Sequence, residues 1–292
     1  MKRKRRWRRF SLGVFIFLFL WIILAQSCMK FRISDKKAKE KFSGAGVPLT
    51  TAIVNVEGYH MHYVKTGNDS LPTLFFIHGS PGSWTAFERY IRDKELLEKY
   101  RMISIDRPGF GYSEFGKARD LSEQSQLIKP VLDQLKNNKP MYVIGHSLGG
   151  PMAIKLAADN PGTFAGIVLL APSVDPSEEK PEKWRPWLMY TPLKYFIPGA
   201  LAPSNRELWY LKKDLVKLKT DFPKIECPVW IIQGDKDNLV PPGNAGYAAK
   251  MLIHSPLIET TIIEGAGHFI PWNHYTDIRA VLLKLTDDKK AP

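Results

Sequence analysis

The sequence predicts an α/β fold in which a mostly parallel, twisted sheet is covered by helices on both faces. Short runs that are apolar throughout recur along the chain, and segments of about 10–15 residues with helical periodicity separate them. Strands that are apolar on both faces are typical of parallel sheets enclosed by helices. The 292 residues are 44% hydrophobic and 12% aromatic, which is enough for one large domain with a buried core.

The chain begins with a cationic segment that is followed by an apolar one. Residues 1–30 carry eight Lys or Arg and no Asp or Glu, and residues 10–25 are mostly apolar. This is the pattern of a secretory signal or an uncleaved signal anchor. Residues 24–28 also resemble the box at which bacterial lipoproteins are cleaved, with Cys28 as the lipid anchor. Lipoprotein, uncleaved anchor and secreted protein all stay open.

All three interpretations give the same location. Clustered Lys and Arg stay on the cytoplasmic side, so the residues after 30 face outward, in the cell envelope. The formal net charge of +13 comes mainly from this segment, because residues 43–292 hold 29 basic and 27 acidic side chains. A nucleic-acid partner is therefore not expected, and the expected macromolecular partner is a membrane.

We divide the chain into a signal or anchor segment at residues 1–30, a charged tether at 31–50 and one domain at 51–292. Two alternating runs predict a hairpin that forms the antiparallel N-terminal edge of the sheet. The predicted strands are residues 52–57, 60–65, 73–78, 101–106, 141–145, 166–170, 229–233 and 259–264. The predicted helices are residues 84–98, 122–136, 148–159 and 274–285.

The alternation of strands and helices breaks once, after the sixth strand. Residues at about 172–222 are rich in Pro, Trp and Tyr and contain helix-like stretches. This insertion is too long for an ordinary connecting loop. It predicts a small helical cap on the domain.

Residues 145–149 read Gly-His-Ser-Leu-Gly, directly after an apolar strand and directly before a helix. A nucleophile on a sharp strand-to-helix turn needs small neighbours, because its backbone is strained. The turn exposes the hydroxyl at the carboxyl end of the sheet, where open α/β folds hold their ligands. We therefore predict that Ser147 is a nucleophile.

Four further motifs follow in order: His-Gly-Ser-Pro-Gly at 78–82, Asp-Arg-Pro-Gly-Phe-Gly-Tyr-Ser at 106–113, Gly-Asp-Lys-Asp-Asn-Leu-Val-Pro at 234–241 and Gly-Ala-Gly-His-Phe at 265–269. With these motifs, residues 51–285 resemble the α/β-hydrolase superfamily. The resemblance implies the α/β-hydrolase fold and a triad in the order Ser, Asp, His.

The chemistry of acyl transfer assigns the roles. Ser147 needs a base, and His268, on a Gly-flanked loop after the last strand, is the candidate. Asp235 and Asp237 compete as the acid that orients this imidazole. The spacing of the family motif selects Asp237. The oxyanion hole is expected at the backbone N–H of Leu148 and, by resemblance, of Ser80.

Trp84 and Phe110 are candidates for the wall of an apolar substrate pocket under the aromatic cap, although both positions also suit the core. Only two cysteines are present, and neither offers metal-ligand spacing. Neither a disulfide framework, a metal nor an organic cofactor is expected.

The first functional hypothesis is a serine hydrolase that cleaves a small, apolar carboxylic ester or related acyl bond through an acyl-enzyme. The second keeps the fold and changes the bond. The His-Gly-Ser-Pro-Gly loop resembles that of proline iminopeptidases, and related enzymes cleave lactones or C–C bonds. Serine at 147, where aspartate would be expected, disfavours epoxide hydrolysis. The third hypothesis is a catalytically silent binding module on a membrane tether.

Overall fold

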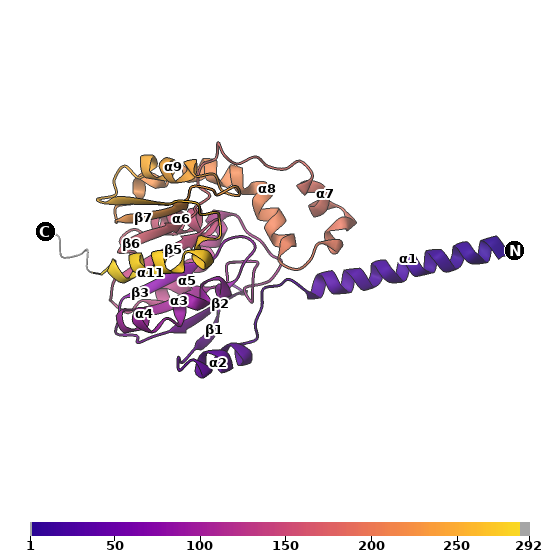
Figure 1. The fold of residues 1–292 in the computed structure, drawn as a ribbon, viewed down its shortest axis with the longest axis horizontal. Helices are drawn as coiled ribbons and strands as arrows, with labels where there is room; N and C mark the ends of the chain where they lie inside the picture. The colour runs from indigo at the N-terminus through magenta and orange to yellow at the C-terminus, as the bar shows by residue number, and fades with distance from the viewer. Residues whose placement is uncertain (1, 287–292) are drawn as a thin grey trace.

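An eight-stranded mixed sheet with the strand order β1-β2-β4-β3-β5-β6-β7-β8 runs through the centre of the molecule (Figure 1). In the computed structural model, which describes residues 2–286, the strands are β1 (Thr50–Val56), β2 (Tyr59–Thr66), β3 (Thr73–Ile77), β4 (Arg101–Ile105), β5 (Met141–His146), β6 (Gly166–Leu170), β7 (Val229–Gly234) and β8 (Ile258–Ile263). The pairs β1·β2 and β2·β4 are antiparallel, and the remaining pairs are parallel. The predicted sheet, with its antiparallel N-terminal edge, is confirmed.

The hairpin between β1 and β2 closes through a two-residue turn. Glu57 and Gly58 both have positive φ, and the Asn55 side chain accepts a hydrogen bond from the Gly58 N–H at 2.7 Å. Two successive positive φ values match the right-handed twist of paired strands. The turn therefore sets the register Val56↔Tyr59 at the edge of the sheet.

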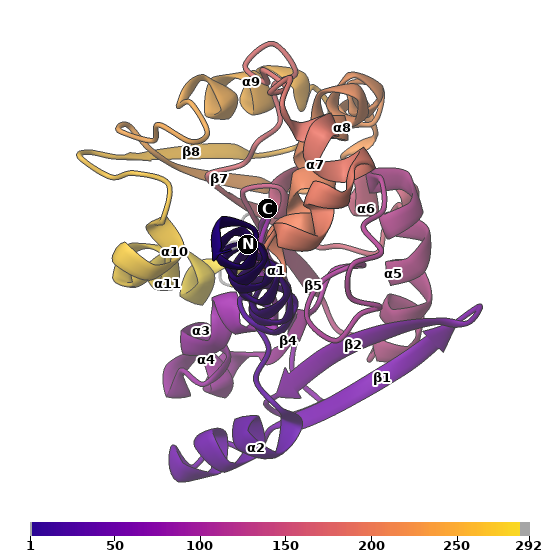
Figure 2. The same cartoon turned by 90° about the vertical axis from the view of Figure 1, so that its right-hand side faces the viewer.

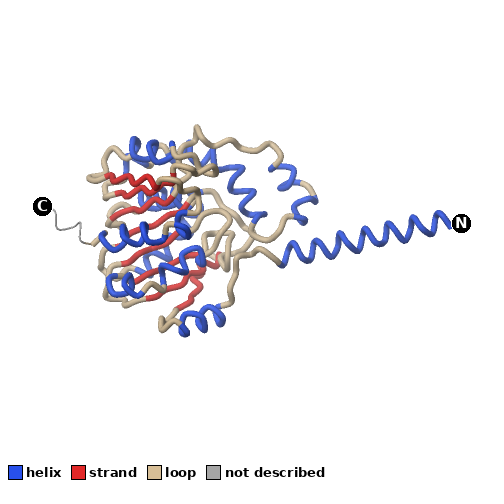
Figure 3. The backbone as a smooth tube through the Cα atoms, viewed as in Figure 1, coloured by secondary structure: helices blue, strands red, loops and turns tan. Residues whose placement is uncertain are grey.

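Helices cover both faces of the sheet, as Figure 3 shows in blue around the red strands. One core cluster lies under α5 (Leu121–Leu135), α6 (Gly149–Asp159) and α9 (Gly243–Met251). The second lies under α3 (Glu88–Ile91), α4 (Lys94–Lys99) and α11 (Tyr275–Lys284). Strands β3 to β7 are buried along their whole length, which explains why their sequences are apolar on both faces.

One predicted helix is wrong in its extent. Residues 84–98 form a 3₁₀ turn, η1 (Trp84–Phe87), then α3, then α4, because the Asp93 side chain caps a new helix through the Leu96 N–H at 3.0 Å. The helix predicted at residues 274–285 is confirmed as α11, and a separate turn, α10 (Ile270–Asn273), precedes it. The cap after β6 consists of α7 (Arg185–Tyr190), η2 (Pro192–Phe196), α8 (Leu201–Leu218) and η3 (Phe222–Lys224), and its prediction is confirmed.

The predicted tether at residues 31–50 is also corrected. It contains α2 (Asp35–Gly44), which begins at the capping side chain of Ser34. Ala38 and Phe42, four residues apart, are buried on this highly charged helix, and the Phe42 ring lies 6.1 Å from that of Trp84. The charged composition concealed a two-residue apolar stripe that docks on the body.

Helix α1 (Lys2–Ser27) projects away from the body (Figure 1). Residues 3–27 are long and apolar enough to cross a membrane, and only a small share of this helix is buried. Figure 2 looks along α1 from its N-terminus and shows that it stands at one end of the molecule, between α7 and α10. Helix α1 therefore leaves the domain beside the cap.

If α2 is a docked part of the domain, Phe42→Ala should lower the free energy of unfolding by about 3–5 kcal/mol through the cavity that it leaves. Chemical denaturation of the full chain in detergent measures this change. Lys39→Ala, on the exposed side of the same helix, is the matched control and should change it by less than about 0.5 kcal/mol. Equal stability of both variants would mean that α2 is a free tether.

Candidate active site

Ser147 occupies the tight turn between β5 and α6. Its φ is +55°, a left-handed conformation that costs energy for a residue other than glycine. Its N–H donates to the Leu170 carbonyl at 2.9 Å, and its own carbonyl accepts from the N–H groups of Gly150 (2.9 Å) and Ser173 (3.2 Å). The end of β6 and the segment after it therefore brace the strained turn.

The glycines on each side of Ser147 are required by close backbone contacts. A Cβ atom at Gly145 would overlap the carbonyl of Gly149, and a Cβ atom at Gly149 would overlap the carbonyl of Ile77. Helix α6 can thus begin directly behind Ser147, pressed against the end of β3. The Gly-x-Ser-x-Gly pattern is explained by this packing.

The loops after β7 and β8 bring Asp237 and His268 together. The His268 Nδ1 atom lies 2.7 Å from Asp237 Oδ2, and both side chains are buried. Asp237 Oδ1 accepts from the N–H groups of Leu239 (2.9 Å) and Val240 (2.8 Å). Because Nδ1 is bonded to Asp237, Nε2 is the ring nitrogen of His268 that remains available to a partner in the cavity. Both His268 and Ser147 line this cavity.

Burial alone would raise the pKa of Asp237. The hydrogen bonds from His268 and from the N–H groups of Val240 and Leu239 outweigh it and hold the pKa of this carboxyl below its ordinary value. Asp237 is therefore an anion beside the imidazole. Asp235 instead accepts a hydrogen bond from the Gly265 N–H, as a turn residue does.

His146, next to the nucleophile in sequence, has a positioning function that the sequence did not reveal. Its Nε2 atom lies 3.1 Å from the carbonyl oxygen of His268, and the two rings are 4.9 Å apart. Burial and the neighbouring His268 lower the pKa of His146 to about 3, so its imidazole is neutral. A neutral ring that donates from Nε2 holds the backbone of the His268 loop.

The loop after β3 lies against Ser147. A Cβ atom at Gly79 would be 2.9 Å from the Cβ of Ser147. The Gly79 carbonyl is held by His78 Nδ1 (2.7 Å) and by Arg107 Nη2 (3.1 Å). In a trans peptide the N–H of the next residue points in the direction opposite to the carbonyl. The two hydrogen bonds to the Gly79 carbonyl therefore also fix the direction of the Ser80 N–H.

The N–H groups of Ser80 and Leu148 donate to no acceptor within residues 2–286. Both residues line the same cavity as Ser147. Two free donors beside a hydroxyl form the arrangement that binds a developing oxyanion.

A buried ion pair connects this loop to the cap. Arg107, fully buried after β4, makes a bidentate pair with Glu207 of α8 at 2.7 and 2.9 Å. The same guanidinium donates to the carbonyls of His78 (2.8 Å) and Gly79. The cap is thereby joined to the two residues that precede Ser80.

The cavity has a volume of about 1,040 Å³ and lies between the cap and the carboxyl ends of the strands. Its cap side includes Leu208 and Leu211, and its aromatic wall is formed by Phe31, Phe269 and Trp272. The carboxyl ends of parallel strands are where ligands of this class of fold bind.

The assignment of Trp84 and Phe110 to the pocket wall is wrong, since neither lines the cavity. Trp84 is buried in the core, and its backbone N–H donates to Asp106 Oδ1 at 2.8 Å. Phe110 is buried under the loop, with its ring 5.6 Å from that of His78. Both side chains therefore pack in the core next to the site and do not line the cavity.

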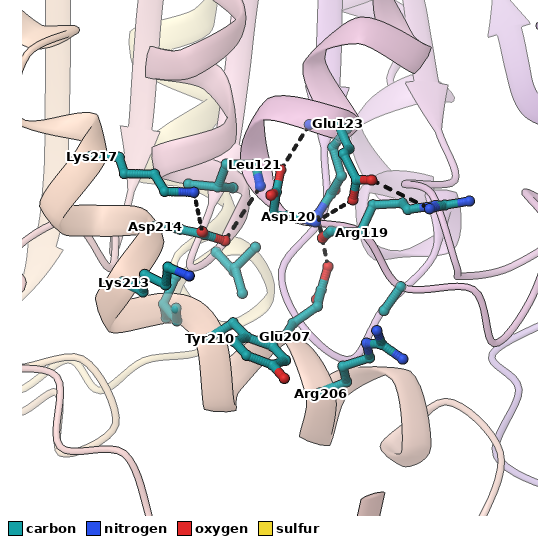
Figure 4. A pocket seen from close by; sticks show the side chains of 14 residues that line it. Arg119, Asp120, Leu121, Glu123, Arg206, Glu207, Tyr210, Lys213, Asp214 and Lys217 are labelled. Atoms are coloured by element: carbon teal, nitrogen blue, oxygen red, sulfur yellow. Dashed lines mark hydrogen bonds and ion pairs between the residues drawn. The ribbon is translucent and has the colours of Figure 1, made fainter.

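A second, smaller cavity of about 210 Å³ lies between α8 and the N-terminus of α5 (Figure 4). Asp120 caps α5 through the Glu123 N–H at 2.9 Å, and Asp214 of the cap accepts from the Leu121 N–H at 3.4 Å. Burial, together with the charge of Asp120, raises the pKa of Asp214 to about 6. Asp214 thus links the cap to the N-terminus of α5, which Asp120 already caps.

Residues 2–286 contain no group of three or more His, Cys, Asp or Glu side chains that could hold a metal ion. The groups that the cavity presents include a hydroxyl, a buried imidazole–carboxylate pair and backbone N–H donors.

Comparison with known proteins agrees with this architecture. Residues 72–208 match the family described as the alpha/beta hydrolase fold. The chain is 25% identical over 261 residues to a 2-hydroxy-6-oxononadienedioate/2-hydroxy-6-oxononatrienedioate hydrolase of Pseudomonas sp, covering 76% of this chain and 90% of the relative. It is 25% identical over 257 residues to the monoglyceride lipase of Homo sapiens, covering 75% and 82%.

A solved structure of the epoxide hydrolase CorEH superimposes with a TM-score of 0.64 at 20% identity, covering 83% of this chain and all of that one. At this identity the likeness shows the fold. Together with the eight-stranded sheet, it confirms the predicted α/β-hydrolase fold.

Glu207→Ala should lower the free energy of unfolding by about 3–5 kcal/mol, because it leaves the buried Arg107 charge without its partner. Urea denaturation measures the loss. Glu182→Ala, which removes an exposed partner of Arg185 from the same cap, should cost less than about 1 kcal/mol. The double variant Arg107→Met/Glu207→Leu should recover most of the stability, and its failure to do so would contradict the unpaired charge as the cause.

Proposed function

We propose that this protein is a serine hydrolase of the α/β-hydrolase superfamily that cleaves a carboxylic ester or related acyl bond. The observation that carries the proposal is the 2.7 Å contact between His268 Nδ1 and Asp237 Oδ2 on the cavity that also contains Ser147. A hydroxyl is a poor nucleophile without a base, and this pair supplies one.

In the proposed first step, Ser147 Oγ attacks the carbonyl carbon of the substrate while its proton passes to His268 Nε2. Asp237 stabilises the imidazolium and keeps its orientation. The negative charge on the tetrahedral intermediate is bound by the N–H groups of Ser80 and Leu148, each worth about 3 kcal/mol of barrier. Collapse breaks the ester bond, and the imidazolium protonates the leaving alcohol.

Water then attacks the acyl-enzyme. His268 takes a proton from the water, the acid is released and the proton returns to Ser147 Oγ. The first step is thus repeated with water in place of Ser147. No metal or cofactor takes part in the proposed sequence.

A serine hydrolase of this fold can also cleave other bonds: a prolyl amide, a lactone or the C–C bond of an oxo acid. The similarity to the Pseudomonas oxo-dienedioate hydrolase supports the last of these. Epoxide opening is disfavoured even though an epoxide hydrolase shares the fold, because a serine stands where a carboxylate nucleophile would be expected. A silent binding module is disfavoured by the retained His268–Asp237 pair.

We further propose that α1 anchors the protein in a membrane, with the catalytic domain outside the cytoplasm. Trp21 Nε1 donates to the Phe196 carbonyl at 3.3 Å, and Gln26 Nε2 donates to the Tyr195 carbonyl at 2.9 Å. The Gly199 N–H donates to the Ala25 carbonyl at 2.9 Å. Because cleavage before Cys28 would remove these contacts, they favour an uncleaved anchor over a lipoprotein.

A fluorophosphonate probe should label the wild-type protein at Ser147, and Ser147→Ala should remove labelling and lower ester hydrolysis by about 10⁴-fold or more. Gel fluorescence and peptide mass spectrometry measure the label. Ser173→Ala removes another hydroxyl from the same cavity and should leave the label in place. Labelling that persists in Ser147→Ala would refute the proposed nucleophile.

p-Nitrophenyl esters of increasing chain length, a proline p-nitroanilide, a lactone and an oxo-dienoic acid separate the possible bonds. We expect the ester with the highest kcat/KM to exceed the other three classes by at least about 100-fold. A faster amide, lactone or C–C cleavage would keep the fold and replace the proposed reaction.

Cys28→Ser should leave the electrophoretic mobility and the membrane fraction of the protein unchanged, because the proposed anchor is the peptide helix itself. Immunoblots of fractionated cells measure both quantities. Loss of processing or release from the membrane would show that Cys28 carries a lipid and that α1 is removed.

A further inference from the structure

The cap exposes five large apolar or aromatic side chains on its first two elements. Trp187 and Tyr190 on α7, Trp184 just before it, and Leu193 and Tyr195 on η2 are between 47% and 69% exposed. Helix α7 buries none of its residues, and Trp184, Trp187 and Tyr190 follow at intervals of three, which places them on one side of the helix. We call these five residues the aromatic cap face.

Contacts between α1 and the cap set the level of this face relative to a bilayer. Arg9 is the last of the N-terminal cationic residues. At a rise of about 1.5 Å per residue, the apolar run of residues 10–25 covers about 24 Å of a hydrocarbon core of about 30 Å, so the outer surface of this core lies close to residue 25. Trp21 and Gln26, whose side chains bond to η2, therefore lie close to this surface, one on each side of it.

Because η2 lies beside Trp21 and Gln26, it cannot stand clear of the membrane when α1 spans it. The tip of the cap, which lies beside the C-terminal end of α1 (Figure 1), is then at the level where lipid headgroups meet acyl chains. Trp and Tyr are the side chains enriched at this level, where an aromatic ring is buried and its polar atom stays hydrated.

The mouth of the catalytic cavity lies at the same end of the molecule. Phe31, four residues beyond the end of α1, lines the cavity. So do the exposed side chains of Leu239, Phe269 and Trp272. In Figure 2, α10, which contains Trp272, and α7 stand on opposite sides of α1. The cavity thus carries apolar side chains next to α1, whereas its lining from the cap includes the charged residues 178–180, 182 and 185.

We propose that the aromatic cap face binds the outer leaflet of the bilayer that α1 spans, and that the cavity receives an amphiphilic acyl ester directly from this leaflet. The substrate class would be a lipid with an ester bond near its polar end and an apolar chain. The identity of the substrate rests on the proposed function, and the docking of the cap rests on the proposed anchor and on the contacts of η2. A substrate that stays in the leaflet avoids the cost of moving its chain into water.

The docking is tested without any enzyme activity. An environment-sensitive fluorescent amino acid replaces Tyr190 in one full-length protein and Ile253 in another, and each is reconstituted into phosphatidylcholine vesicles that contain a doxyl-labelled lipid. Ile253 is exposed but precedes β8, so it lies at the opposite end of the sheet from the cavity. We expect blue-shifted, strongly quenched emission at 190 and neither effect at 253. Equal, water-like emission at both positions would overturn the docking.

The source of the substrate is tested with the variant Trp187→Ser/Leu193→Ser, since neither side chain lines the cavity. Its hydrolysis of 4-methylumbelliferyl oleate embedded in vesicles should fall about tenfold, while hydrolysis of p-nitrophenyl acetate in water stays within about twofold. The control Ile253→Ser/Leu257→Ser removes exposed apolar side chains from the opposite end and should keep both rates.

An unchanged rate on the embedded ester would overturn delivery from the leaflet. If neither ester is hydrolysed in a Ser147-dependent manner, the proposed function fails, and the fluorescence at position 190 still decides whether the cap docks on the membrane.

Discussion

The candidate site depends on one strained turn. Ser147 is held at positive φ between the end of β5 and the first turn of α6, and the backbone of β6 secures it by a hydrogen bond to Leu170. Gly145 and Gly149 allow the strand, the helix and the end of β3 to approach more closely than any side chain would permit. The Ser147 hydroxyl, the free N–H groups of Ser80 and Leu148 and the loop after β3 lie together at one cavity because of this packing.

A second constraint joins the catalytic end of the sheet to the cap. Arg107 is buried without access to water, so its charge requires Glu207 and the carbonyls of His78 and Gly79 at the same time. The cap cannot shift without disturbing the hydrogen bond from Arg107 to the Gly79 carbonyl. Since η2 of the same cap also bonds to α1, hydrogen bonds and an ion pair connect α1, the cap and the loop after β3.

Features encoded within a short stretch could be predicted from the sequence. The parallel strands are apolar on both faces because they are buried on both faces. Their positions along the chain could therefore be predicted from the sequence. The turn at Ser147 carries its own glycines. Asp237 and His268 each follow a strand and sit in loops with recognisable spacing, and the carboxyl ends of β7 and β8 then bring them within hydrogen-bond distance.

Features that depend on residues far apart in sequence were decided only by the tertiary structure. Helix α2 looked like a solvated tether, because two apolar side chains among many charges have no evident partner until Phe42 meets Trp84. Trp84 itself looked like a pocket wall, and only the packing places it in the core. The pairing of Arg107 with Glu207 spans 100 residues and leaves no local pattern. Composition and spacing specify which chemistry a residue can perform, whereas burial and partners, which determine its role, arise when the chain folds.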